Sequence, residues 1–191
     1  MSNAAALALS RVLQHHNTTL MTLNLCCCDG NCIITIAGWS ALFQFLHNPD
    51  SAMEELLLDG SFIDYLTTTA NNKLLALTDV LINQNTLREL NIGGNYLLRT
   101  TGLATLSPVL LNPNLALEVL DLDLIPINNE IMISFADTLA NNNRLRGLDI
   151  DNYHETFSIT YNGYVAFTAI CVIGHGILAG KYLAKYCDSL I

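Results

Sequence analysis

The chain has 191 residues, 51% of them hydrophobic and 13% charged, and its formal net charge is −9. This composition argues against a disordered chain, because the apolar surface is large enough to offset the entropy lost on folding. The acidic balance argues against binding to nucleic acid or to an anionic membrane surface, so we expect any electrostatic partner to be basic. The length predicts a single domain over residues 1–191.

Residues 1–10 contain no Lys or Arg ahead of an apolar run and no small-residue cleavage site. The sequence therefore predicts a cytoplasmic protein without a secretory signal. Six cysteines at positions 26, 27, 28, 32, 171 and 187 do not form the evenly spread framework of a small disulfide-stapled domain. We expect free thiols.

The first predicted element is a helix over residues 5–16, with the pattern of the helical half of a repeat whose strand is absent. This leaves open that the chain is a fragment of a longer solenoid.

Five short strands are predicted next, because five segments share the spacing apolar-x-x-apolar-x-apolar. They are Leu20, Leu23, Leu25; Met53, Leu56, Leu58; Leu87, Leu90, Ile92; Leu117, Leu120, Leu122; and Leu145, Leu148, Ile150. Three places after each segment, a polar residue is expected to satisfy backbone groups of the turn. Cys28 and Asn95 fit this expectation and Ser61 is tolerable, whereas Ile125 and Tyr153 depart from it.

Amphipathic helices are predicted between the strands, each ending in an Asn-rich turn. Their apolar positions recur at the spacing of a helix that buries one face. The positions are Trp39, Leu42, Phe45 and Leu46; Leu103, Leu106, Val109 and Leu110; and Met132, Phe135 and Leu139. A glycine at 38, 102 and 163 opens the helical part of three repeats, where we expect a tight turn or a close approach.

These residues resemble the ribonuclease-inhibitor-like class of leucine-rich-repeat proteins, including expanded repeat families of unicellular algae. The resemblance covers about residues 5–170. It implies an α/β right-handed horseshoe of about five strand-helix repeats, with parallel strands on the concave face and helices on the convex face. Residues 171–191 would form an irregular C-terminal helix or cap. The class carries no catalytic residues, so a non-enzyme is expected, although some members activate GTPases, which gives an alternative function.

The side chains between the core leucines of a strand must point to its other face, because side chains alternate along a strand. Fifteen such positions are predicted on the concave face, and seven of them are acidic and none basic. The acidic ones are Glu55, Asp59, Glu89, Asp121, Asp123, Asp149 and Asp151. We interpret them as the binding site for a basic protein or peptide. Their alternative role is to keep the open face soluble.

Other chemistry finds little support in the sequence. The cysteines at 26–32 lack a second pair at zinc-binding spacing, so no metal is expected. No phosphate loop, nucleophile elbow or His-Glu-x-x-His sequence occurs, and no cofactor is predicted. The uncharged apolar run at 164–180 allows a membrane-tethered structural protein as a further alternative, although we favour the last repeat helix there.

Overall fold

The computed structural model describes residues 1–16, 19–27, 34–48, 51–63 and 67–150. Within these ranges the chain is an α/β protein with one five-stranded parallel sheet, whose strand order β1-β2-β3-β4-β5 follows the sequence. The strands are β1 Thr22–Asn24, β2 Glu55–Leu57, β3 Glu89–Asn91, β4 Val119–Asp121 and β5 Gly147–Asp149. The α/β class and the positions of the five strands are therefore confirmed.

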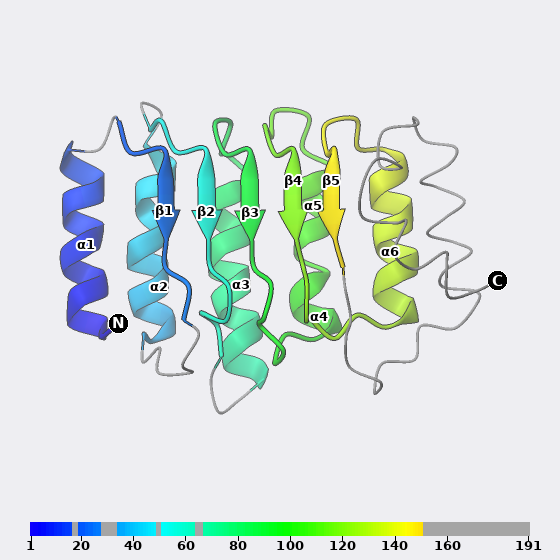
Figure 1. Ribbon diagram of the computed structural model, residues 1–191, viewed down its shortest axis with the longest axis horizontal. Coiled ribbons are helices and arrows are strands. Elements are labelled where there is room, and N and C mark those ends of the chain that lie inside the picture. Colours follow the sequence, from blue (N-terminus) through cyan, green and yellow to red (C-terminus); the bar gives the residue numbers. More distant parts are fainter. Residues whose placement is uncertain (17–18, 28–33, 49–50, 64–66, 151–191) are drawn as a thin grey trace.

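The helices lie in a second layer behind the strands, and α1 projects beyond the edge of the sheet at β1 (Figure 1). They are α1 Asn3–His16, α2 Ile36–Phe43, the 3₁₀ helix η1 Gln44–His47, α3 Thr67–Leu81, α4 Thr100–Leu103, α5 Leu106–Leu110 and α6 Asn129–Ala140. Helical segments connect the successive strands, as parallel neighbours require a long crossover. The predicted cap at 171–191 and tether at 164–180 lie outside the described residues.

Leucines in register form the floor of the core beneath the sheet. The middle residues of β1 to β4 are paired Leu23, Leu56, Leu90 and Leu120, and each is at most 9% exposed. Full burial of one such side chain contributes about 1.5–3 kcal/mol. The row therefore fixes which face of each of these four strands is turned inward.

The predicted apolar stripes of the helices are buried against this floor. Trp39 of α2 stacks on Phe43 with ring centroids 5.2 Å apart and meets the edge of Phe62 at 5.4 Å. Leu103, Leu106 and the other predicted positions are buried too, but the helix is interrupted between α4 and α5. Pro108 explains the interruption, because it has no N–H to donate to the carbonyl of Ala104.

The helix glycines serve close approach rather than a turn. Gly38 and Gly102 lie inside α2 and α4, and neither has a positive φ. A Cβ on Gly38 would collide with the Asn3 side chain, and one on Gly102 would collide with the Asn71 side chain. These glycines therefore let α2 pack closely against α1, and α4 against α3. We call each strand with the helical segment that follows it a unit. Gly163 lies outside the described residues.

Asn95 is the polar residue expected three places after the third strand pattern, and it is fully buried. Its Oδ1 accepts the Phe62 N–H at 2.6 Å, and its Nδ2 donates to the carbonyls of Ile92 at 2.7 Å and Leu58 at 3.1 Å. One unit earlier, Ser61 Oγ donates to the carbonyl of Leu25 at 2.5 Å. One turn residue thus links adjacent units. Cys28 and Tyr153 lie outside the described ranges.

The Asn-rich turns, which follow the helices, also link neighbouring units, because their side chains bond to the end of an earlier helical segment. Asn112 Nδ2 donates to the carbonyl of Ile82 at 2.5 Å, and Asn142 Nδ2 donates to that of Leu110 at 2.6 Å. Asn142 Oδ1 also accepts the Leu145 N–H at 2.8 Å. An amide is suited to this position because it donates and accepts at once.

Candidate protein-binding face

The outward positions of the strands, with those that lie two residues after the strand ends, form one surface, which we call the strand face. It consists of Thr22, Asn24 and Cys26; Glu55, Leu57 and Asp59; Glu89, Asn91 and Gly93; Val119, Asp121 and Asp123; and Gly147 and Asp149. The paired positions include Glu55 beside Glu89 and Asp121 beside Asp149. The structure thus places like charges on adjacent strands. Asp151 lies outside the described residues.

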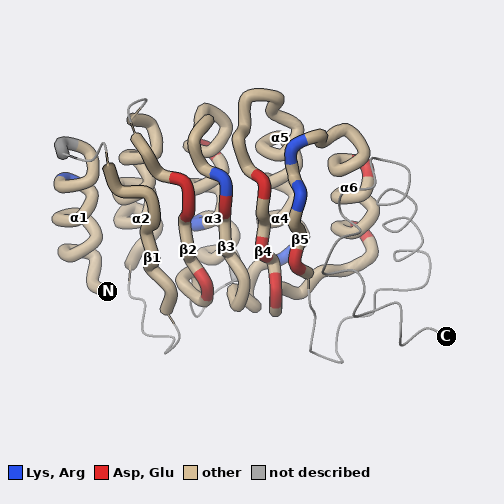
Figure 2. Tube along the Cα trace, turned by 45° about the horizontal axis from the view of Figure 1, so that its top comes forward, with Lys and Arg blue, Asp and Glu red and all other residues tan. Residues whose placement is uncertain are grey.

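Acidic residues follow the strand face from β2 to β5 (Figure 2). Val119 is 36% exposed among them, and Leu57 is half-buried. The face therefore offers a partner carboxylates with two separate apolar side chains, one on β2 and one on β4. Its chemistry is that of recognition by charge, hydrogen bonds and limited apolar contact.

Two of the carboxylates already have neutral hydrogen-bond donors. Glu55 Oε2 accepts the Thr22 hydroxyl at 2.8 Å. Asp121 Oδ2 accepts the Asn91 amide at 2.9 Å, and its Oδ1 accepts the Asp123 N–H at 2.8 Å. These bonds orient the carboxylates without neutralising their charge.

A repeated local motif accounts for the polar side chains at the last strand position. Asn24 Oδ1 accepts the Cys26 N–H at 3.0 Å, and Asn91 Oδ1 accepts the Gly93 N–H at 2.8 Å. Asp121 makes the same bond to Asp123. Short Asn and Asp side chains favour such turns because they reach the backbone two residues on. Asp121 therefore has a structural role as well as a charge.

The pKa of Asp121 reflects its crowded surroundings. Burial raises this pKa most, the backbone hydrogen bond from Asp123 lowers it, and the negative charges of Asp149 and Asp59 raise it further. The net effect is a pKa above the ordinary value.

Two further acids of the strand face have a raised pKa. Burial raises the pKa of Asp59. Burial also raises the pKa of Glu89, and the neighbouring charges of Glu55 and Asp121 add to the rise. Repulsion between these charges favours the approach of a cation, which would lower each pKa.

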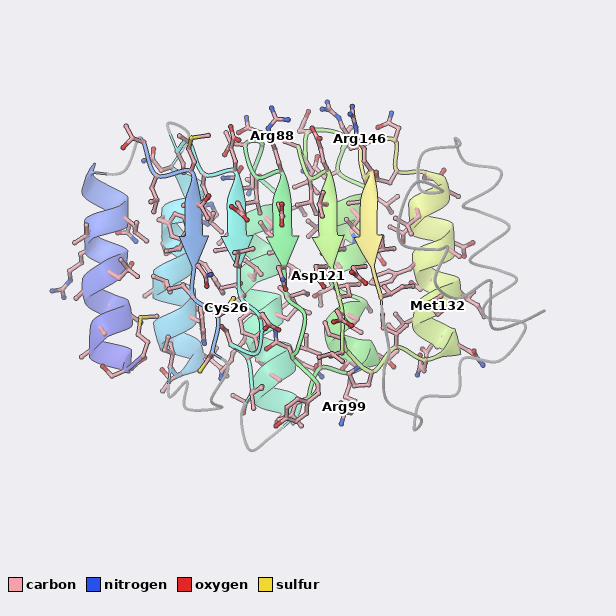
Figure 3. The ribbon with its side chains drawn as sticks, viewed as in Figure 1. Cys26, Arg88, Arg99, Asp121, Met132 and Arg146 are labelled. Atoms are coloured by element: carbon pink, nitrogen blue, oxygen red, sulfur yellow. The ribbon has the colours of Figure 1, made fainter. Side chains whose placement is uncertain are left out.

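A charged row at the N-terminal ends of the strands was not predicted from the sequence. Arg88 Nη1 lies 2.7 Å from Glu118 Oε1, and Arg88 Nε lies 4.0 Å from Glu54 Oε2. Figure 3 shows Arg88 and Arg146 at this edge of the sheet. Exposed pairs of this kind contribute about 0–1 kcal/mol. The sequence feature that could have predicted this row is the charged residue directly before each strand from β2 to β5.

No group of three or more His, Cys, Asp or Glu side chains could hold a metal ion within the described ranges. Cys26 and Cys27 are partly buried, whereas Cys28 and Cys32 lie outside those ranges. In the same part of the chain, no helix is long and apolar enough to cross a membrane.

Comparisons with known proteins show the fold alone. No protein-family model and no curated protein matches the chain. A solved structure of leiomodin-1 actin-binding site 2 is similar, with a TM-score of 0.66 and 14% identity over 96% of this chain and 94% of that one. The tropomodulin C-terminal domain of Caenorhabditis elegans is similar with a TM-score of 0.62 and 13% identity, over 100% and 99% of the two chains.

These neighbours correct the resemblance inferred from the sequence. The similar structures are the leiomodin and tropomodulin domains, and no leucine-rich-repeat family matches. The assignment to the ribonuclease-inhibitor-like class is therefore wrong. The strand, helix and glycine patterns together misled the assignment, because periodic apolar residues report which face of a strand or helix is turned inward and not a particular family. The GTPase-activating alternative depended on that resemblance and is withdrawn with it.

Proposed function

We propose that the chain is a non-catalytic protein-binding module whose strand face receives a partner with basic side chains. The observation that carries this proposal is the array of acidic residues on adjacent strands. Glu89 is paired with Glu55, and Asp121 with Asp149, so like charges stand side by side. Such an arrangement destabilises an isolated sheet and is relieved by a cationic partner.

The fold supports a search for the partner among cytoskeletal proteins. The neighbour with the TM-score of 0.66 is described as an actin-binding site. Actin is therefore the first partner to test, with a basic site on it as the expected contact. A cytoplasmic location belongs to the same proposal, as does a solenoid of about five strand-helix repeats with the strand face as its inner surface.

Affinity capture from a native extract, with mass spectrometry, and co-sedimentation with purified actin would test the proposal. Both are to be done at low and high salt. We expect a specific protein whose binding weakens strongly as salt rises, because charge pairs at an exposed face are screened. Binding that is unchanged by salt would contradict a charge-based contact. Failure to retain any protein, including actin, would contradict the binding role itself.

A further inference from the structure

The charged row at the N-terminal ends of the strands alternates in sign. Its members stand directly before β2, β3, β4 and β5 and are Glu54, Arg88, Glu118 and Arg146. From Arg88 onward, each backbone N–H donates to the carbonyl of the row member on the preceding strand, and all three distances are 2.7 Å. The row is therefore in register, with one charge on each strand in the order minus, plus, minus, plus, which can be followed along the upper ends of β2 to β5 (Figure 2).

The charges of the row are exposed and only partly paired within the chain. The Arg88 side chain is 56% exposed, although its Nη1 lies 2.7 Å from Glu118 Oε1. The Glu54 side chain is 45% exposed, and its Oε2 lies 4.0 Å from Arg88 Nε. Arg146 is exposed, and no salt bridge to it is found within the described ranges. The outer members of the row can therefore pair with charges of a partner.

Two exposed apolar side chains accompany the row on the helix side. Ile82 directly follows α3 and is 45% exposed, and Leu111 directly follows α5 and is 49% exposed. Asn112 Nδ2 joins the two turns by its hydrogen bond to the Ile82 carbonyl. The turn before β3 thus supplies a cation and an apolar side chain, and the turn before β4 supplies an anion and an apolar side chain.

This arrangement is complementary to its own reverse. In a two-fold dimer, if residue i contacts residue j of the other copy, then j also contacts i. A two-fold axis that passes between β3 and β4, perpendicular to the sheet, reverses the order of the row in the second copy. Three kinds of contact then form between the copies: Arg88 with Glu118, Glu54 with Arg146, and Ile82 with Leu111.

We propose that this surface binds a second copy of the chain in a two-fold dimer. We call it the charged edge, and it consists of Glu54, Ile82, Arg88, Leu111, Glu118 and Arg146. A wholly basic or wholly acidic partner would place like charges against two members of the row, and an uncharged partner would desolvate the charges without pairing them. The reversed second copy places opposite charges at all four positions.

The dimer leaves the strand faces of both copies open, because rotation about an axis perpendicular to the sheet keeps them pointing in the same direction. The charged edge therefore does not depend on the proposed role of the strand face. We expect a weak dimer, since exposed ion pairs contribute little singly and the apolar contact is small.

The test is sedimentation equilibrium of the full chain up to millimolar concentration. The net charge of −9 on each copy opposes association at long range. A salt concentration of about 0.15 M screens this repulsion more than it screens pairs in contact. We expect the unmodified chain to form dimers under these conditions.

Charge reversal tests the reversed order of the row. Arg88→Glu places carboxylates opposite each other at the centre of the dimer, and Glu118→Arg places guanidinium groups there. Each variant should therefore dimerise at least tenfold more weakly than the unmodified chain. An equimolar mixture restores opposite charges at both central contacts, so the two variants should form a heterodimer, detected through a fluorescent label on one of them.

Two control variants match these changes. Glu130→Arg reverses an exposed charge at the start of α6 and should dimerise normally. Ile82→Ser should weaken the dimer at least tenfold, because its loss counts twice in a two-fold interface, whereas Ile133→Ser, at a residue 48% exposed on α6, should not.

Three results would overturn the proposal. The first is an unmodified chain that stays monomeric at millimolar concentration. The second is a variant with Arg88→Glu or Glu118→Arg alone that dimerises as tightly as the unmodified chain. The third is a mixture of these two variants that does not associate.

Discussion

At the scale of single residues, the side chains of most consequence are those that join one unit to the next. Asn95 satisfies backbone groups of two units from a fully buried position. Its role could be predicted, because a polar residue three places after the strand pattern is expected to satisfy backbone groups of the turn. The Asx-type bonds of Asn24, Asn91 and Asp121 were not predicted, although the same residue types recur at the last strand position.

Asn95→Ala is expected to lower the free energy of unfolding by roughly 2–4 kcal/mol, because it leaves the Phe62 N–H and buried carbonyls without partners. Urea denaturation measures this loss. Asn85→Ala, at an exposed turn residue, should change stability by less than about 0.5 kcal/mol. Equal losses for the two variants would mean that the Asn95 bonds do not hold the units together.

Leu124 has a φ of 57°, in the left-handed region where the equivalent Gly60 and Gly94 have 63° and 66°. A side chain there costs roughly 1–2 kcal/mol, part of which glycine recovers despite its entropy in the unfolded chain. Leu124→Gly should therefore stabilise the fold by about 0.5–1 kcal/mol in thermal or urea unfolding. Gly94→Ala is the reciprocal change and should destabilise it, since a Cβ would also meet Asp59. A destabilised Leu124→Gly variant would contradict this account of the turn.

The raised pKa of Glu89 makes stability depend on pH. Because this pKa is above its ordinary value in the folded state, the stabilising contribution is present at low pH and is lost as pH rises through the folded pKa. Glu89→Gln should therefore be more stable than the unmodified chain at pH 7, and this advantage should vanish below the ordinary glutamate pKa. Urea midpoints between pH 3 and 8 measure the difference, with Glu130→Gln on α6 as control. An advantage independent of pH would contradict the electrostatic cause.

At the scale of elements, the sequence predicted strands better than helices. The leucine spacing located all five strands because a one-residue shift would turn the leucines out of the core. The helical stripes were also located, but the interruption between α4 and α5 was missed although Pro108 stands in the sequence. The row of Arg88, Glu54 and Glu118 was not predicted, because these residues lie just before the strands, outside the leucine pattern.

Strand register can be tested by deleting leucine side chains on opposite faces of the sheet. Leu120 is 1% exposed in the core, and Leu57 is on the strand face. Leu120→Ala should lower the free energy of unfolding by roughly 2–5 kcal/mol, whereas Leu57→Ala should cost much less. Similar losses in urea denaturation would show that the register is wrong.

At the scale of the whole molecule, the sequence predicted a parallel α/β array with an acidic face, and the structure confirms both. The sequence patterns suggested a wrong family, because they record which side chains are inward and leave many related folds compatible. The raised pKa of Asp59, Glu89 and Asp121 was also out of reach, since it depends on burial and on distances between strands.

Calorimetric affinity for actin, or for the protein captured from extract, tests the central claim most directly. Glu55→Gln, Glu89→Gln and Asp149→Asn together remove three charges from the strand face, while Asp79→Asn, Glu130→Gln and Asp137→Asn remove three exposed charges from α3 and α6. We predict that the first triple variant binds at least tenfold more weakly and loses salt dependence, whereas the second binds as the unmodified chain. Equal affinity of the two triple variants would contradict the assignment of the strand face as the binding site.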